Sequence, residues 1–193
     1  SQKIYSITLN ESILNTSIQE FINNNLNSDI TSLILKGTQF NSVETLEIIE
    51  QIESKKKCET KLPTWYATER IYYPNKLNIE QTSSEITAKH KSSLISGNSI
   101  IDLTGGFGVD VHAFSQLADH VVHVEQNEWL SEVVAHNFKH LGRTNVDCVN
   151  TTAEDFLEAL RLAFLASSSW FSKLIRFALL SRFIKNLRVI KSL

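Results

Sequence analysis

Apolar positions follow two different spacings along the chain, and the change between them predicts two structural regions. Between residues 11 and 57 the apolar residues recur every three or four positions, as on one face of a helix, which predicts three helices. Between residues 99 and 160 short β-branched runs alternate with helical patterns, which predicts one parallel sheet with helices between its strands. The strands predicted by this alternation are 100–103, 121–125 and 146–149.

A proline-bounded segment separates the two regions. Pro63 and Pro74 are the two prolines of the chain, and together they disfavour a continuous helix between them. Two interpretations are open: an aromatic linker packed on the core, which is favoured, or a loop that stacks on bases or gates a substrate. Its four aromatic residues are Trp65, Tyr66, Tyr72 and Tyr73.

Polar residues on either side of this linker predict helix ends. The basic run 55–57 is expected to end the third helix as solvated charges that complement the helix dipole, with nucleic-acid contact as the alternative. Thr82 and Glu85 have the spacing of a capping box and predict a helix that runs to about Ile95.

Composition is that of an ordinary globular protein, but charge is unevenly distributed. The 193 residues are 42% hydrophobic and 21% charged. Cys58 and Cys148 match no metal-binding or redox spacing, so a reducing, cytoplasmic location is expected, without a signal peptide or transmembrane segment. Residues 1–160 hold 12 basic and 21 acidic residues, whereas residues 161–193 hold seven basic residues and no acidic one.

Three of the six glycines lie in one short turn, and they predict a nucleotide site. Gly105, Gly106 and Gly108 follow the predicted strand 100–103 and precede a helix that begins near Val109. Glycine allows positive φ and close approach of a ligand to the backbone. A strand, a glycine turn and a helix N-terminus in this order bind the phosphate or nucleoside end of a ligand in doubly wound α/β proteins.

Acidic residues beside this turn indicate which nucleotide is bound. Glu125 ends the second predicted strand, where a carboxylate accepts hydrogen bonds from ribose hydroxyls. Asp102 ends the first strand and can accept from the ammonium group of an amino-acid-bearing nucleoside, directly or through water. A dinucleotide fingerprint starting at Gly106 would need glycine at position 111, where Val111 stands, so an NAD-dependent oxidoreductase is disfavoured.

At these positions the sequence resembles class I S-adenosylmethionine-dependent methyltransferases. Residues 101–108 are similar to the first motif of that family, with Thr104 where glycine is usual, and residues 122–125 are similar to the second. The resemblance implies that the turn 104–108 lies beneath the methionine moiety and that Glu125, followed by Gln126, holds the ribose. Thr152 stands where an acid usually meets the adenine, so Glu154 or Asp155 would have to take that role.

The sequence resembles one branch more closely, an uncharacterised bacterial methyltransferase family whose longer members carry a THUMP-like domain. The shared segments are 62–67, 73–74, 80–89 and 102–110. This resemblance implies that residues 81–85 lie over the methionine end of S-adenosylmethionine, with a plain helix cap as the alternative. It also implies a nucleic-acid base, most plausibly in RNA, as the methyl acceptor.

The C-terminal tail departs from that family. A fourth strand ending in an Asp-Pro or Asn-Pro element is expected after Leu160, but residues 161–193 contain no proline, glycine, aspartate or glutamate. Three interpretations compete: a basic amphipathic helix for RNA or a membrane surface, a helix packed on the sheet edge, or the product of a truncated or frame-shifted gene, which is favoured.

The predicted architecture is therefore an incomplete Rossmann-like α/β sheet with an N-terminal helical region. Residues 1–78 form the helical region with its aromatic linker, 79–160 the first half of the Rossmann-like domain, and 161–193 an atypical tail. The predicted function is S-adenosylmethionine-dependent methyl transfer, with an inactive cofactor-binding or interaction protein as the alternative and no assigned catalytic residue. His136 and His140 have the spacing of a zinc pair, but solvated histidines are favoured.

Overall fold

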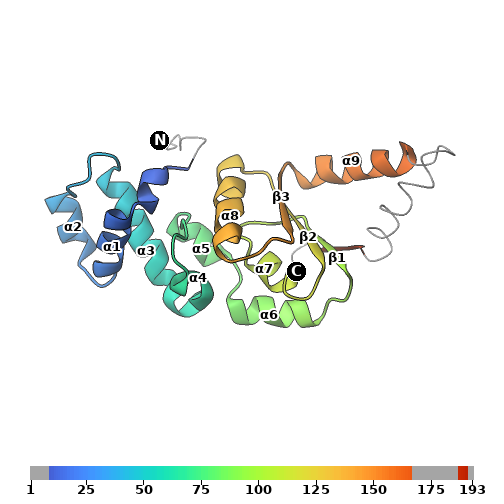
Figure 1. Cartoon of the computed structure of the whole chain (residues 1–193), viewed down its shortest axis with the longest axis horizontal. Helices are drawn as coiled ribbons and strands as arrows, with labels where there is room; N and C mark the ends of the chain where they lie inside the picture. Colours follow the sequence, from blue (N-terminus) through green and yellow to red (C-terminus); the bar gives the residue numbers. More distant parts are fainter. Residues whose placement is uncertain (1–8, 167–186, 191–193) are drawn as a thin grey trace.

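The computed structural model describes residues 9–166 and 187–190, which form a helical region joined to a parallel sheet (Figure 1). The helical region contains a 3₁₀ turn, η1 (Glu11–Leu14), and the helices α1 (Thr16–Asn24), α2 (Ile30–Lys36), α3 (Thr45–Lys61), α4 (Pro63–Ala67), α5 (Lys76–Gln81) and α6 (Glu85–Ser93). The sheet region contains β1 (Ser99–Asp102), α7 (Val109–Phe114), β2 (His120–Glu125), α8 (Glu128–His140), β3 (Val146–Asn150), α9 (Ala153–Ala166) and β4 (Leu187–Ile190).

The sheet has the strand order β3-β2-β1-β4, and every neighbouring pair is parallel. Asp102 of β1 pairs in register with His123 of β2, so the carboxyl ends of the two central strands lie side by side. This arrangement of parallel strands with intervening helices is a Rossmann-like α/β fold, as the alternation of apolar patterns predicts.

The β4 strand corrects the prediction that the fourth strand is absent. Leu187–Ile190 pairs with β1, on the side opposite β2, whereas one interpretation of the tail was an amphipathic helix. A run of four residues is too short for its apolar spacing to separate a strand from a helix, and pairing with the edge of β1 selects the extended form. Residues 167–186 of the tail lie outside the described residues. The predicted domain boundary at residue 160 falls inside α9.

The two faces of the sheet have separate cores. One face shares a continuous core with α7, α8 and the helical region, including Trp65, Ile100 and Phe138. The other face is small and is covered by α9, where Phe156 and Leu160 pack against it. The helical region is therefore part of the main core of the protein.

The linker is packed on this core, as favoured from its aromatic residues. Trp65, Tyr72 and Tyr73 are buried, and only Tyr66 is half-buried. The amide of Asn137 on α8 donates to the carbonyl of Tyr72 and accepts from its N–H, both at 2.9 Å. The amide of Gln51 on α3 holds Tyr73 in the same way, at 2.6 and 3.0 Å. The side-chain amides of Gln51 and Asn137 thus supply the backbone hydrogen bonds that a neighbouring strand would otherwise provide to the linker.

Two helix ends differ from the predictions. The third helix, which begins at Thr45, continues through the basic run 55–57 to Lys61. Ser84, not Thr82, caps α6, because Glu85 instead accepts hydrogen bonds from the backbone N–H and hydroxyl of Thr64 at 2.6 and 2.8 Å. The short helix α5 was not predicted.

Candidate functional site

A cleft of about 640 Å³ opens at the carboxyl ends of β1 and β2, within the size range of small-molecule sites. One wall is formed by the glycine turn and the end of β2. The opposite wall comes from α5, α6 and the residues between them. Of the residues predicted for a cofactor, Thr104, Gly105, Gly106 and Glu125 line this cleft.

Glu125 is held in place by two backbone amides. Its Oε2 accepts a hydrogen bond from the N–H of Gly106 at 2.9 Å, and its Oε1 accepts one from the N–H of Asn127 at 2.8 Å. A carboxylate has about four acceptor positions, so each oxygen of Glu125 keeps one for a ligand. The fixed side chain can therefore accept from two adjacent hydroxyl groups.

The other end of the Gly106 residue is held by a buried histidine. Nε2 of His123 lies 3.1 Å from the Gly106 carbonyl oxygen, so this nitrogen carries the proton and donates. A Cβ on Gly105 would overlap the imidazole ring of His123, so only glycine fits at position 105. Because His123 and Glu125 are two positions apart on β2, one strand fixes both the carbonyl and the N–H of Gly106.

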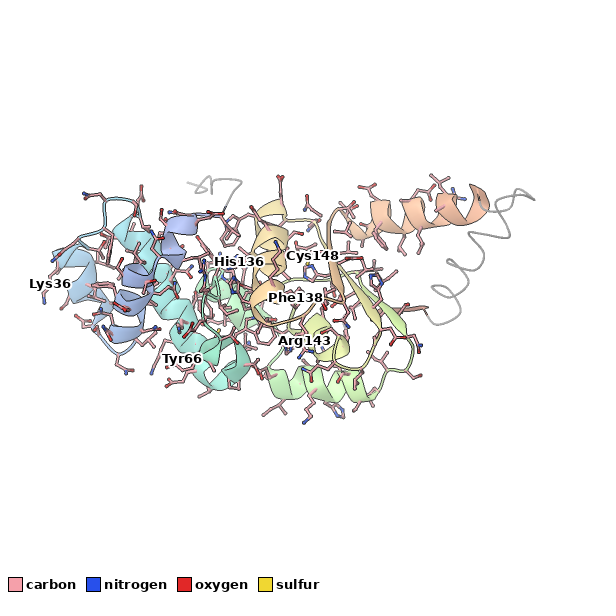
Figure 2. All side chains as sticks on the ribbon, in the orientation of Figure 1. Lys36, Tyr66, His136, Phe138, Arg143 and Cys148 are labelled. Carbon is pink, nitrogen blue, oxygen red and sulfur yellow. The ribbon has the colours of Figure 1, made fainter. Side chains whose placement is uncertain are left out.

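Gly108 serves helix packing and lies outside the cleft lining. It has φ of 78°, and an added Cβ would lie 2.8 Å from Cζ of Phe138 and 3.0 Å from Cγ1 of Val134. Both of these residues belong to α8, where Figure 2 shows Phe138. Glycine at this position therefore lets α7 begin close to α8.

Asp102 lies beneath the turn, and only 4% of it is exposed. Its Oδ1 accepts hydrogen bonds from the backbone N–H and the hydroxyl of Thr104, at 2.9 and 3.0 Å. Burial raises the pKa of Asp102, against the effect of these two hydrogen bonds, and burial lowers the pKa of the neighbouring His123. Asp102 thus orders the turn from below.

A charged pair that the sequence did not single out joins the two walls, with Lys91 on α6 and Asp110 on α7. Nζ of Lys91 lies 2.8 Å from Oδ2 of Asp110 and 3.0 Å from the hydroxyl of Ser83. Oδ1 of Asp110 is buried and has no hydrogen-bond partner among the described residues. Gln81, Thr82 and Ser83 line the wall opposite the glycine turn, where residues 81–85 were expected to meet a cofactor.

Two predicted site residues lie away from the cleft. Gln126 is exposed, and its carbonyl accepts a hydrogen bond from the Asn150 amide at 3.1 Å. Glu154 is exposed in the first turn of α9. Neither residue lines the cleft. The carboxylate of Asp155 accepts from the hydroxyl of Thr152 as part of the α9 cap.

The described residues show neither a metal site nor a membrane span. No group of three potential ligands gathers among the histidine, cysteine and acidic side chains of residues 9–166 and 187–190. His136, of the possible zinc pair, instead donates to the carbonyl of Arg70 at 2.8 Å. No helix in this part of the chain has the length and apolar character needed to cross a membrane.

A solved structure with a similar fold supports the comparison with methyltransferases. The crystal structure of a "putative methyltransferase" from Porphyromonas gingivalis W83 matches with a TM-score of 0.65 and 26% sequence identity, over 77% of this chain. The matched part is 37% of that protein, so this chain spans well under half of its length. No protein-family model and no curated protein sequence matches this chain. The fold of the chain is thus similar to that of a protein described as a methyltransferase.

Proposed function

We propose that the cleft binds S-adenosylmethionine and that the chain belongs to a methyltransferase. The observation that carries this proposal is the fixed carboxylate of Glu125, which faces a cleft together with the glycine turn and keeps two acceptor positions for the ribose hydroxyls. The similarity to a protein described as a methyltransferase supports it.

The pair formed by Lys91 of α6 and Asp110 of α7 fits the amino-acid end of the same ligand. Lys91 supplies a cation for its carboxylate, and the carboxylate of Asp110 supplies an acceptor for its ammonium group. A zwitterion thereby meets one charge of each sign. When bound, the cofactor supplies a methyl group on a positively charged sulfur. The protein contributes position and exclusion of water, which is most of what an in-line methyl transfer requires.

We propose a base in RNA as the acceptor, on the strength of the sequence resemblance alone. A second candidate function is cofactor binding without catalysis. It is favoured by the composition of residues 161–193, which contain no proline, glycine, aspartate or glutamate and so hold no Asp-Pro or Asn-Pro element within them.

Titration calorimetry with S-adenosylmethionine and S-adenosylhomocysteine tests the cofactor proposal. Glu125→Gln keeps the size of the side chain but places an NH₂ group against a backbone N–H, and we expect its affinity to fall at least tenfold. Glu132→Gln, on an exposed position of α8, is the matched control and should bind like the wild type. Failure of the wild-type protein to bind either compound would refute cofactor binding.

Transfer of labelled methyl groups into total RNA separates the two candidate functions. Binding with incorporation supports the enzyme, whereas binding without incorporation supports the inactive alternative. We expect little or no incorporation by this 193-residue form, because the acceptor-gripping element is absent from its sequence.

A further inference from the structure

A second cleft, of about 680 Å³, lies in the helical region between α1, α3 and the residues around the end of α4. Tyr66 lines it from α4, on the side away from the sheet (Figure 2). Lys55 lines it from α3, in the basic run that was predicted to be solvated. That prediction is wrong for this residue, because only 8% of Lys55 is exposed.

The ammonium group of Lys55 is buried without an ion pair. Its Nζ donates to Oδ1 of Asn23 at 2.7 Å and lies 5.7 and 6.0 Å from the ring centroids of Tyr66 and Tyr73. No carboxylate of the described residues lies within 4.0 Å of it. A buried ammonium without a carboxylate is unfavourable, and burial accordingly lowers the pKa of Lys55. An anion bound in the cleft would compensate the buried positive charge of Lys55.

Exposed charges at the rim do not supply that anion. Glu20, Glu69 and Arg70 also line the cleft, but all three are exposed, so water and salt screen them. Glu69 opposes the lowered pKa of Lys55 without forming an ion pair with it. The electrostatic potential at the base of the cleft is therefore set by the buried Lys55.

Backbone strain marks the same cleft. Arg70 has φ of 60°, and it is the one residue other than glycine with positive φ in the described part of the chain. Its carbonyl is held by His136 on α8, at 2.8 Å. Strain of this kind gathers at ligand sites, where the surrounding structure maintains it. A cavity, a buried unpaired cation and a strained residue thus coincide.

We propose that this cleft binds one phosphodiester unit of single-stranded RNA, with the phosphate at Lys55 and a base beside the ring of Tyr66. A phosphodiester carries a single negative charge, which matches the single buried cation. The side-chain amides of Gln19 and Asn23 line the cleft and can hydrogen-bond the polar edge of a base or a ribose. Stacking on Tyr66 requires an unpaired base, which selects a single strand. The choice of RNA rests on the proposed function.

Fluorescence anisotropy with a labelled single-stranded RNA of mixed sequence tests this site in the full chain. Lys55→Met keeps an unbranched side chain that is one atom shorter and removes its charge, and we expect it to weaken binding about tenfold. It should also reduce the slope of log affinity against log salt by about 0.7, as for one lost phosphate contact. Lys56→Met is the matched control, because Lys56 is half-exposed and already pairs with Glu59 at 2.7 Å. It should change the affinity by less than about twofold.

Thermal unfolding separates a binding role of Lys55 from a structural one. If Lys55 is present for the ligand, Lys55→Met leaves Tm unchanged or raises it, since an apolar chain replaces an unpaired buried charge. A fall in Tm with unchanged RNA affinity would make Lys55 a structural residue and overturn the proposal. Equal losses for Lys55→Met and Lys56→Met, or no RNA binding by the wild type, would overturn it as well.

Cofactor titration without RNA keeps the two proposals apart. The Lys55 cleft and the glycine-turn cleft share no lining residue. If the wild-type protein fails to bind the cofactor but still binds RNA in a way that depends on Lys55, only the cofactor proposal is refuted and the RNA site at Lys55 is retained. Cofactor binding by a wild-type protein that does not bind RNA would remove the second site alone.

Discussion

The two clefts of this protein differ in how their polar groups are balanced. At the glycine turn, each charged group has a partner: Glu125 accepts from two backbone amides, Asp102 from Thr104, and Lys91 pairs with Asp110. In the helical region, Lys55 is buried with an amide and two aromatic rings but with no carboxylate from residues 9–166 and 187–190 within 4.0 Å. The first cleft is organised by strand ends and short turns, whereas the second depends on how separate helices pack. We infer that the first is preformed and that the second is completed by its ligand.

The largest effect is expected from breaking the close approach that shapes the first cleft. Gly105→Ala places a methyl group against the ring of His123, which is fully buried and cannot move aside. We expect a loss of about 3 kcal/mol in the free energy of unfolding, as for other overpacked cores. Urea denaturation measures it, and cofactor affinity should fall with it because Gly106 shifts.

A double-mutant cycle shows whether His123 is the cause. His123→Ala removes the ring, so Gly105→Ala should be much less destabilising in that background, with a coupling of more than about 1 kcal/mol. Gly142→Ala measures a different cost, because nothing lies within 4 Å of its added Cβ but its φ of 68° strains any side chain. Additive effects of the two substitutions at 105 and 123 would contradict the steric explanation.

Sequence patterns predicted the first cleft better than the second, for a physical reason. The strand, the glycine turn and the acid at the end of the next strand are local features, and parallel pairing necessarily brings them together. The position of Glu125 and the parallel order of β1, β2 and β3 follow from them. The packed linker was also predictable, since buried aromatic residues between prolines have few other roles.

The remaining features depend on partners distant in sequence. Lys55 is buried because Asn23 and two tyrosines meet it from other elements, and nothing near it in sequence indicates this. The cap of α6 was misplaced because Glu85 pairs with Thr64, 21 residues earlier. Local propensity also missed β4, whose extended form is selected by the edge of β1.

Breaking the amide pairing between the two regions is expected to have the next largest effect. Asn137→Leu leaves the buried N–H and carbonyl of Tyr72 without the partners that Asn137 supplies, which should lower the free energy of unfolding by about 2 kcal/mol. Glu132→Leu, on an exposed position of the same helix, should have little effect. Because the two regions share one core, unfolding should remain a single transition; two separate transitions in the wild type would contradict that.

The smallest effect concerns pH, and it acts at the contact between the two regions. His112 of α7 packs edge-on against Trp65 of α4, with ring centroids 4.7 Å apart, and only 6% of it is exposed. Burial, aided by the positive charge of Arg143, lowers its pKa from 6.5 to about 4. The unfolded chain therefore takes up the proton first as the pH falls, so stability is present above pH 6.5 and is lost between pH 6.5 and about 4.

Urea denaturation at pH 7 and pH 5 measures this loss. We expect the free energy of unfolding to fall by about 1 to 2 kcal/mol from this histidine over that interval. His112→Gln should reduce the fall, whereas His90→Gln, on an exposed position of α6, should leave it unchanged. His123 is also buried with a lowered pKa, so part of the pH dependence should survive in His112→Gln. If instead His112→Gln keeps the whole pH dependence, the contact between α4 and α7 does not depend on a neutral imidazole, and the acid sensitivity comes from other groups such as His123.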